Sequence, residues 1–161
     1  MKTAIVYYSM SGNVAYAAEK VAKETPADLV EISPKHAYPS TGVKKFLWGG
    51  TAVVMGDAPE LMPYDLDFDA YDRIVFGTPV WAGSFVPPLR TFVEENRDKL
   101  AKKRMAAFAC SSGPEGDKAL DKLAQLIGID DFETRLTLID PKDKPKLRDN
   151  TEIRNFCSRL G

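Results

Sequence analysis

Cysteine and histidine are scarce in this chain of 161 residues, which has two cysteines, Cys110 and Cys157, and one histidine, His36. The two cysteines lie far apart without metal-ligand spacing, and a single histidine cannot complete a zinc site with them. We therefore expect no metal centre and two reduced thiols, as in a cytoplasmic protein. A lone histidine with no orienting partner also argues against a Ser-His-Asp hydrolase.

The chain has neither an excess of one charge nor a long apolar run. Its 22 Lys and Arg residues balance 23 Asp and Glu residues, for a net charge of −1, so it lacks the electrostatic footprint of a nucleic-acid binder. The apolar run at residues 4–8 is far too short to span a membrane, and no cleavage pattern accompanies it. With 44% hydrophobic residues, residues 1–161 are expected to form one domain that is neither secreted nor membrane-inserted.

Short apolar runs alternate with longer stretches of helical period. The pattern predicts strands at residues 3–8, 29–32, 73–77, 105–110 and 132–139. It predicts helices at residues 14–25, 43–54, 87–100, 117–127 and 149–160. In the last of these, Asp149 and Glu152 have the spacing of a capping box, with Asp149 at the start. Repeated strand–helix units of this kind form a parallel sheet with helices on both faces.

The polarity of the strands predicts their order in the sheet. Runs 4–8, 74–76 and 105–109 are continuously apolar, as in strands covered on both faces, whereas runs 29–32 and 132–137 admit polar residues and suit the sheet edges. The expected order is 2-1-3-4-5, in which the winding reverses between strands one and three. Ligands of open α/β sheets bind in such a crevice beyond the carboxyl ends of the strands, so we expect the site after Tyr8, Gly77 and Cys110.

The three loops at that edge have residue types suited to a planar ligand with a phosphate. The first, residues 9–14, leads into a helix whose free amides, with two serine hydroxyls, could hold the phosphate. It has no lysine and one glycine, which excludes a Walker P-loop and the dinucleotide fingerprint. In the second, residues 78–85, Trp81 offers a flat face to a ring, and the small residues of the third, 110–116, let backbone amides approach the ring's polar edge. Each loop taken alone is also compatible with an ordinary turn, and Trp81 with a residue that covers the core.

Together these residues resemble the flavodoxin family over nearly the whole chain. The most specific segments are Tyr8-Ser9-Met10-Ser11-Gly12-Asn13 and Gly77-Thr78-Pro79-Val80-Trp81-Ala82-Gly83, followed by Pro87-Pro88; Ser111-Ser112-Gly113 is weaker, and residues 44–50 are also similar. The resemblance implies a flavodoxin-like three-layer α/β sandwich that binds FMN non-covalently. It implies a cofactor site made of Ser9, Met10, Ser11, Gly12, Asn13 and Val14 in the first loop, Thr78, Pro79, Val80, Trp81, Ala82 and Gly83 in the second, and Cys110, Ser111, Ser112, Gly113 and Gly116 in the third.

Two departures from the family pattern bear on function. Val14 stands where many flavodoxins have a threonine, and the third loop has no aromatic residue, whereas a typical electron-transfer flavodoxin covers the ring there with a tyrosine. An open ring face leaves room for hydride donors or quinone-like acceptors. A net charge of −1 also differs from the strong acidity with which carrier flavodoxins dock. We expect an FMN-binding protein that transfers electrons to a partner protein or a small-molecule acceptor, with an NAD(P)H-dependent quinone-type reductase as the alternative.

Two other functions fit this fold class. A signalling receiver domain needs acidic residues after the first and third strands, where this chain has Tyr8-Ser9 and Gly77-Thr78, so we reject it. An interaction module without a cofactor stays a second alternative, against which the first loop and Trp81 argue.

Several conspicuous residues are expected to be structural. We expect His36 to be an exposed loop residue, the acidic run 65–69 to be a solvated turn and no cation site, and Cys110 to be a small buried residue. Trp48 and Met55, on or near the second predicted helix, are expected to pack against the core or form part of a lid, with contact to the flavin as the alternative.

Overall fold

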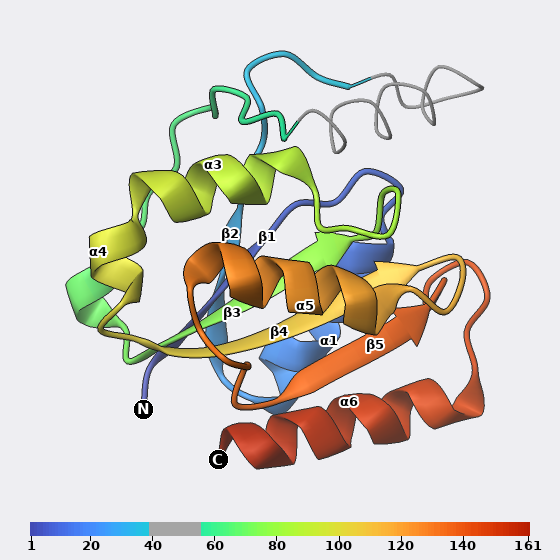
Figure 1. The fold of residues 1–161 in the computed structure, drawn as a ribbon. Coiled ribbons are helices and arrows are strands. Elements are labelled where there is room, and N and C mark those ends of the chain that lie inside the picture. The colour runs from blue at the N-terminus through green and yellow to red at the C-terminus, as the bar shows by residue number, and fades with distance from the viewer. Residues whose placement is uncertain (39–55) are drawn as a thin grey trace.

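Five parallel strands form the centre of the molecule in a computed structural model that describes residues 1–38 and 56–161 (Figure 1). Their order is β2-β1-β3-β4-β5, as predicted. Tyr7, for example, lies between Glu31 and Gly77 of the neighbouring strands. The strands are β1 (Thr3–Tyr7), β2 (Ala27–Glu31), β3 (Arg73–Pro79), β4 (Arg104–Ser111) and β5 (Arg135–Ile139).

Helices cover both faces of the sheet (Figure 1). One face carries α1 (Asn13–Glu24) and α6 (Leu147–Leu160); the other carries α3 (Pro87–Glu95), the short α4 (Arg97–Leu100) and α5 (Gly116–Ile127). Because successive strand residues point to opposite faces, β1 supplies both layers of the core. Ile5 packs in the cluster beside α1 and α6, and Val6 packs in the cluster beside α3 and α5.

The boundaries of several elements differ from the prediction, and side-chain contacts explain the two largest differences. The single helix expected at 87–100 breaks at Asn96, whose side-chain amide donates to the Phe92 carbonyl and to the Tyr64 hydroxyl, at 2.8 Å each. An amide that bonds the backbone in this way competes with continued helix. Strand β5 begins at Arg135, because the preceding Phe132 turns into the core beside α3 and α5.

The start of the last helix also differs from the prediction. Helix α6 begins at Leu147, and Asp149 lies inside its first turn, where its carboxylate accepts a hydrogen bond of 2.8 Å from the Lys146 backbone N–H. Asp149 therefore occupies the acceptor position of a capping box, and Lys146 is the N-cap residue. The helix predicted at 43–54, with Trp48 and Met55, lies outside the described residues.

Candidate functional site

A cleft of about 520 Å³ lies at the carboxyl edge of the sheet, where β1, β3 and β4 end. Its volume is in the range of small-molecule sites, about 300–1,000 Å³. All three predicted loops contribute to it. The lining residues are Met10, Ser11, Asn13, Val14, Pro79, Val80, Trp81, Ala82, Cys110, Ser111, Ser112, Glu115 and Asp140. The structure thus brings together residues that are up to 130 positions apart in the sequence, such as Met10 and Asp140.

The other predicted site residues belong to the same loops without lining the cleft: Ser9, Gly12, Thr78, Gly83, Gly113 and Gly116. Ser9 and Gly12 shape the first loop. The Ser9 hydroxyl oxygen accepts a 3.1 Å hydrogen bond from the Ala15 N–H in the first turn of α1, one of the donors that a helix N-terminus leaves without an intrahelical acceptor. Gly12 is the N-cap of α1 with φ +95°, which glycine adopts without strain. The amides of Asn13 and Val14 follow in this first turn, where the helix dipole attracts an anion.

Asn13 joins the first loop to the segment between β5 and α6. Its side chain is buried, its carbonyl oxygen accepts a 2.9 Å bond from the Lys142 backbone N–H, and its amide donates to the Asp143 carboxylate at 3.1 Å. The same amide lies 3.4 Å from the Ser11 hydroxyl. One asparagine thereby joins two chain segments beside the N-terminus of α1.

The second loop is a tight hairpin that presents Trp81. Trp81 and Ser84 exchange two backbone hydrogen bonds, of 2.9 and 3.0 Å, across a two-residue turn. Both turn residues have positive φ, +49° at Ala82 and +68° at Gly83, as a type I′ turn requires. The buried Thr78 hydroxyl closes the base of the loop by donating to the Pro79 carbonyl at 2.7 Å and accepting from the Val86 N–H at 3.3 Å. Thr78 therefore fixes the base of this loop without lining the cleft.

Three aromatic side chains support one another beside the cleft. The ring centroid of Trp81 lies 5.9 Å from that of Tyr8 and 5.3 Å from that of Tyr38, and both pairs are nearly perpendicular. Edge-to-face pairs of this kind are favourable. Burial, with the nearby charge of Glu31, raises the pKa of Tyr8 to about 12, so its phenol is protonated at neutral pH. The Trp81 indole is thus held against neutral aromatic surface.

The third loop contributes small residues. The Ser111 hydroxyl donates to the Gly113 carbonyl at 2.5 Å, which closes the turn. Gly116 is needed for packing: a Cβ atom there would lie 2.8 Å from Cγ2 of Thr137, so its lack of a side chain lets α5 approach β5. Cys110 is buried as predicted, and its thiol lies 3.7 Å from the Asn13 carbonyl oxygen. Burial, together with the charges of Asp140 and Asp149, raises the pKa of the Cys110 thiol, which keeps it protonated and unreactive.

Three residues at or near the cleft were not predicted from the sequence. Glu115 and Asp140 line the cleft, and Lys142 lies beside the first loop. Glu115 lies within the third loop itself. A usable signal existed for the other two, because they follow β5, and all strands of a parallel sheet end at the same edge. The segment after β5 is therefore a fourth loop of the site.

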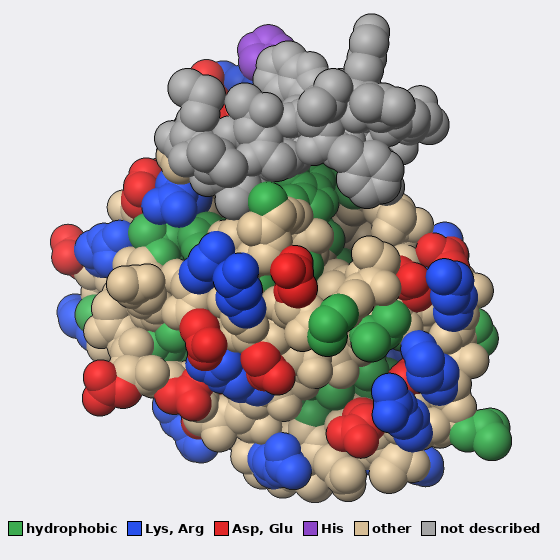
Figure 2. Space-filling model, turned by 45° about the vertical axis from the view of Figure 1, so that its right-hand side comes forward, with side chains coloured by type: hydrophobic (Ala, Val, Ile, Leu, Met, Phe, Trp, Pro, Cys, Tyr) green, Lys and Arg blue, Asp and Glu red, His purple; other side chains and the backbone are tan. Residues whose placement is uncertain are grey.

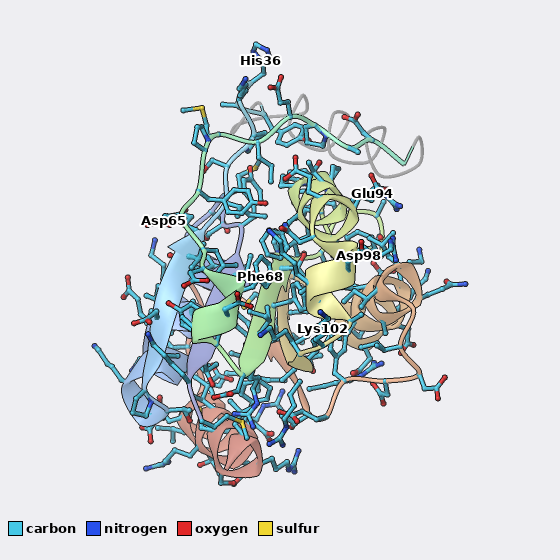
Figure 3. The ribbon with its side chains drawn as sticks, turned by 90° about the vertical axis from the view of Figure 1, so that its left-hand side faces the viewer. His36, Asp65, Phe68, Glu94, Asp98 and Lys102 are labelled. Carbon is cyan, nitrogen blue, oxygen red and sulfur yellow. The ribbon has the colours of Figure 1, made fainter. Side chains whose placement is uncertain are left out.

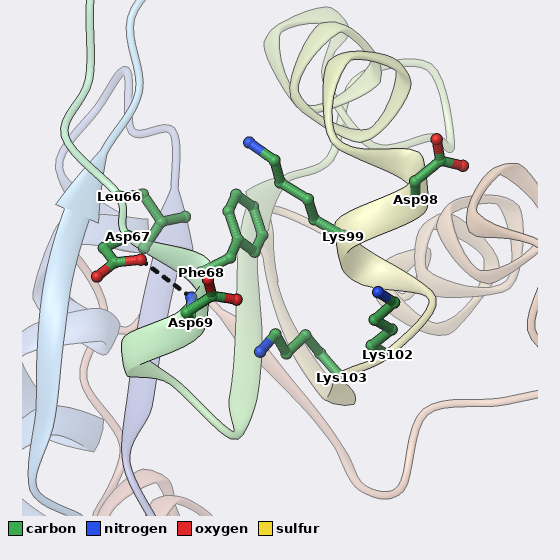
Figure 4. Close-up of a pocket in the computed structure, with 8 residues that line it drawn as sticks. All are labelled: Leu66, Asp67, Phe68, Asp69, Asp98, Lys99, Lys102 and Lys103. Atoms are coloured by element: carbon green, nitrogen blue, oxygen red, sulfur yellow. Dashed lines mark hydrogen bonds between the residues drawn. The ribbon is translucent and has the colours of Figure 1, made fainter.

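A second hollow, of about 260 Å³, lies at the opposite edge of the sheet (Figure 4). Lysines of α4 and the turn after it face the acidic turn that precedes β3, and Asp67 accepts a bond from the Asp69 N–H. Asp65, Asp67 and Asp69 are exposed, as expected for a solvated turn. This hollow lies before the strands begin, away from the edge where open α/β sheets bind ligands.

His36 is exposed on a loop and points away from the sheet, as predicted (Figure 3). Within residues 1–38 and 56–161, no group of three His, Cys, Asp or Glu side chains is arranged to hold a metal ion. Both cysteines are free and buried. None of the helices that the structure describes is long and apolar enough to cross a membrane. On the surface in Figure 2, cationic and anionic side chains are interspersed.

The family model of the flavodoxin domain matches residues 49–136, more than half of the chain. No protein with a curated description matches significantly. A flavoprotein from Lactobacillus acidophilus NCFM, solved in complex with FMN, is similar with a TM-score of 0.72 and 25% identity, covering 88% of this chain and 95% of that one.

Two further solved structures share the fold. One is a protein from Bacteroides uniformis described provisionally as a flavoprotein, with a TM-score of 0.74, 21% identity, and coverage of 98% of this chain and 97% of that one. The other is oxidised flavodoxin 1 from Bacillus cereus, with a TM-score of 0.56, 18% identity, and coverage of 99% and 97%. At these identities the similarity concerns the fold.

Proposed function

This chain belongs to the flavodoxin domain family, and from that premise we propose that its cleft binds FMN non-covalently and that the protein transfers electrons through it. The observation that carries the proposal is the meeting of the three loops in one cleft at the carboxyl edge of the sheet. The FMN complex of the Lactobacillus flavoprotein, 25% identical, supports the same cofactor.

The residues present fit the chemistry of FMN. The first turn of α1, with the Ser11 hydroxyl, suits the phosphate, because helix amides and hydroxyls donate to phosphate oxygens. Trp81 offers an aromatic face to the ring, and the small residues Ser111 and Ser112 leave room for the ring's polar edge. FMN supplies one- and two-electron redox chemistry when bound. The chain would hold the phosphate and orient the ring.

The protonated Cys110 thiol takes no part in electron transfer under this proposal. Its raised pKa and burial make it a packing residue that bonds the first loop. Two free, buried thiols also support a reducing compartment, the cytoplasm, as the place where the protein works. The electron acceptor is then a redox partner protein or a small molecule.

A second candidate, an NAD(P)H-dependent quinone-type reductase, is favoured by the composition of the cleft wall. Trp81 is the one aromatic residue among the described lining residues, and the third loop contributes serines. A ring covered on one face leaves the other accessible to a nicotinamide or a quinone. The interspersed surface charges in Figure 2 and the net charge of −1 give no strong field for docking onto a basic partner.

The visible absorption spectrum of the purified protein tests FMN binding, first as isolated and then after flavin removal, addition of FMN and removal of the excess. We expect a yellow protein whose flavin band is shifted from that of free FMN. Trp81→Ala should weaken FMN binding about tenfold, since an aromatic contact contributes about 0.5–1.5 kcal/mol beyond area burial, and Trp81→Phe should keep most of the affinity. A colourless protein that retains no FMN would refute the proposal and favour an interaction module without a cofactor.

Anaerobic addition of NADPH or NADH to the FMN-loaded protein separates the two redox functions. Rapid bleaching of the flavin band by the nucleotide alone would identify the reductase. Bleaching that requires an added flavodoxin reductase would identify the electron carrier.

A further inference from the structure

The first loop has no lysine of its own, yet the fold brings one to it from the other end of the chain. A Cβ atom built on Gly12 would lie 2.7 Å from Lys142 Nζ and 3.4 Å from its Cδ, so the lysine side chain lies directly over the glycine. Gly12 is the N-cap of α1 and lies between two residues that line the cleft, Ser11 and Asn13. The ammonium group is therefore at the N-terminus of α1.

We propose that Lys142 is a phosphate-binding residue, which supplies the positive charge for the terminal phosphate of FMN. The inference rests on the proposed function and deepens it: it predicts that the site selects the phosphorylated flavin over riboflavin by an electrostatic contact. The cleft-lining part of the first loop supplies only neutral donors, namely backbone N–H groups and the Ser11 hydroxyl. A phosphate monoester carries up to two negative charges at neutral pH, and the Lys142 ammonium would add a full positive charge to the partial charge that the helix N-terminus provides.

The backbone of Lys142 is held by partly buried polar contacts to Asn13. Its N–H donates to the side-chain carbonyl oxygen of Asn13 at 2.9 Å, and the Asn13 amide donates to Asp143 at 3.1 Å. Asn13 is only 7% exposed and is the first residue of α1. The asparagine therefore holds the lysine-bearing segment against the same helix turn that would receive the phosphate.

The neighbouring lysines have partners, whereas Lys142 is available. Lys144 Nζ lies 3.7 Å from the Asp140 carboxylate, and Lys146 Nζ donates to the Ile139 carbonyl at 2.9 Å. Within the part of the chain that the structure describes, Lys142 forms no ion pair with any carboxylate. The carboxylate next to it in sequence, Asp143, accepts the Asn13 amide. An exposed ammonium group beside a helix N-terminus repels the positive end of the helix dipole unless an anion lies between them, so the arrangement suits a bound phosphate.

The test compares the affinities of the flavin-free protein for FMN and for riboflavin, measured by quenching of flavin fluorescence. Lys142→Met should weaken FMN binding about fivefold to tenfold, the size of one charge-assisted contact at a partly exposed site, and should leave riboflavin affinity unchanged. Lys142→Arg should restore most of the FMN affinity. Lys102→Met is the matched control, because it removes the same charge from an exposed lysine in the hollow at the opposite edge of the sheet, and it should change the ratio of the two affinities by less than twofold.

Salt supplies a second readout. Raising the NaCl concentration should weaken FMN binding to the wild-type protein more than FMN binding to Lys142→Met, because salt screens the contact that the variant lacks. Equal FMN affinities and equal salt dependence in the wild type and Lys142→Met would overturn the role of Lys142 and leave the FMN site intact. A wild-type protein that binds neither FMN nor riboflavin would overturn the proposed function and this inference together. All variants are at exposed positions, and circular dichroism will verify that they fold.

Discussion

Replacing Thr78 by valine tests whether the loop that presents Trp81 is held by a buried hydroxyl. Thr78 is fully buried, and its hydroxyl donates to the Pro79 carbonyl at 2.7 Å and accepts from the Val86 N–H at 3.3 Å. Valine keeps the shape but removes both bonds, so the Val86 N–H and the Pro79 carbonyl lose their partner. A buried polar group left unpaired costs about 1–3 kcal/mol, and since the 3.3 Å bond is long, we expect a total loss of about 2–3 kcal/mol.

Thr78→Ser provides the comparison within the same site. Serine keeps the hydroxyl and loses one buried methyl group, which costs about 1 kcal/mol. Urea unfolding should therefore rank the proteins as wild type, then Thr78→Ser, then Thr78→Val. For a chain of this length, the valine variant should also melt about 4–10 °C lower than the wild type.

The functional consequence is a looser second loop. Because only part of the loop population would hold Trp81 in its native position, the apparent FMN affinity of Thr78→Val should fall about threefold to tenfold. Thr91→Val is the control: its hydroxyl donates to the Pro59 carbonyl at 2.6 Å, away from the cleft, so it should lose stability and keep its FMN affinity. A Thr78→Val protein as stable as the wild type, or less destabilised than Thr78→Ser, would refute this reasoning.

Three further predictions concern stability. Glu133→Gln should lower the free energy of unfolding in urea by about 2–4 kcal/mol, because the Arg73 side chain, 1% exposed, loses its charged partner. Arg104→Met removes the exposed partner of the same carboxylate and should cost under about 1 kcal/mol. Equal losses in the two variants would contradict this ranking. Burial raises the pKa of the Cys110 thiol above its ordinary value of 9.0, so the unfolded chain loses the thiol proton first and stability should fall as the pH rises above 9. Cys110→Ala should reduce this fall in the free energy of unfolding, measured by urea titration at several pH values. The same dependence on pH in the variant and the wild type would contradict the prediction. Gly116→Ala should lower the free energy of unfolding by about 1–3 kcal/mol, because the added methyl group overpacks against Thr137. The double variant with Thr137→Ala should recover part of this loss. A Gly116→Ala protein of wild-type stability would contradict the prediction.

The fold was predictable because the pattern that predicts it is local. Continuous apolar runs distinguish the central strands from the edges, and the alternation of short runs with helical periods predicts a parallel sheet. The failures occurred where the contacts of one side chain override local propensity. Asn96 ends α3 because its side-chain amide bonds the Tyr64 hydroxyl and the Phe92 carbonyl, and Phe132 lies outside β5 because it is buried in the core beside α3 and α5. Nothing in the residues adjacent to either position indicates such a partner.

The strand order, the edge where the candidate site lies and the three loops that meet there follow from the sequence, because parallel strands all end at one edge and each loop carries its residues with it. The part that each loop residue plays depends instead on the packing of the folded chain. It assigned the Ser9 hydroxyl to capping α1, the Thr78 hydroxyl to closing the second loop and Gly116 to packing against Thr137. Lys142 lies beside Gly12, about 130 residues away in the sequence, because β5 forms one edge of the sheet and the loop after it lies near the N-terminus of α1. Contacts between such distant segments depend on how the layers pack, which no local pattern encodes.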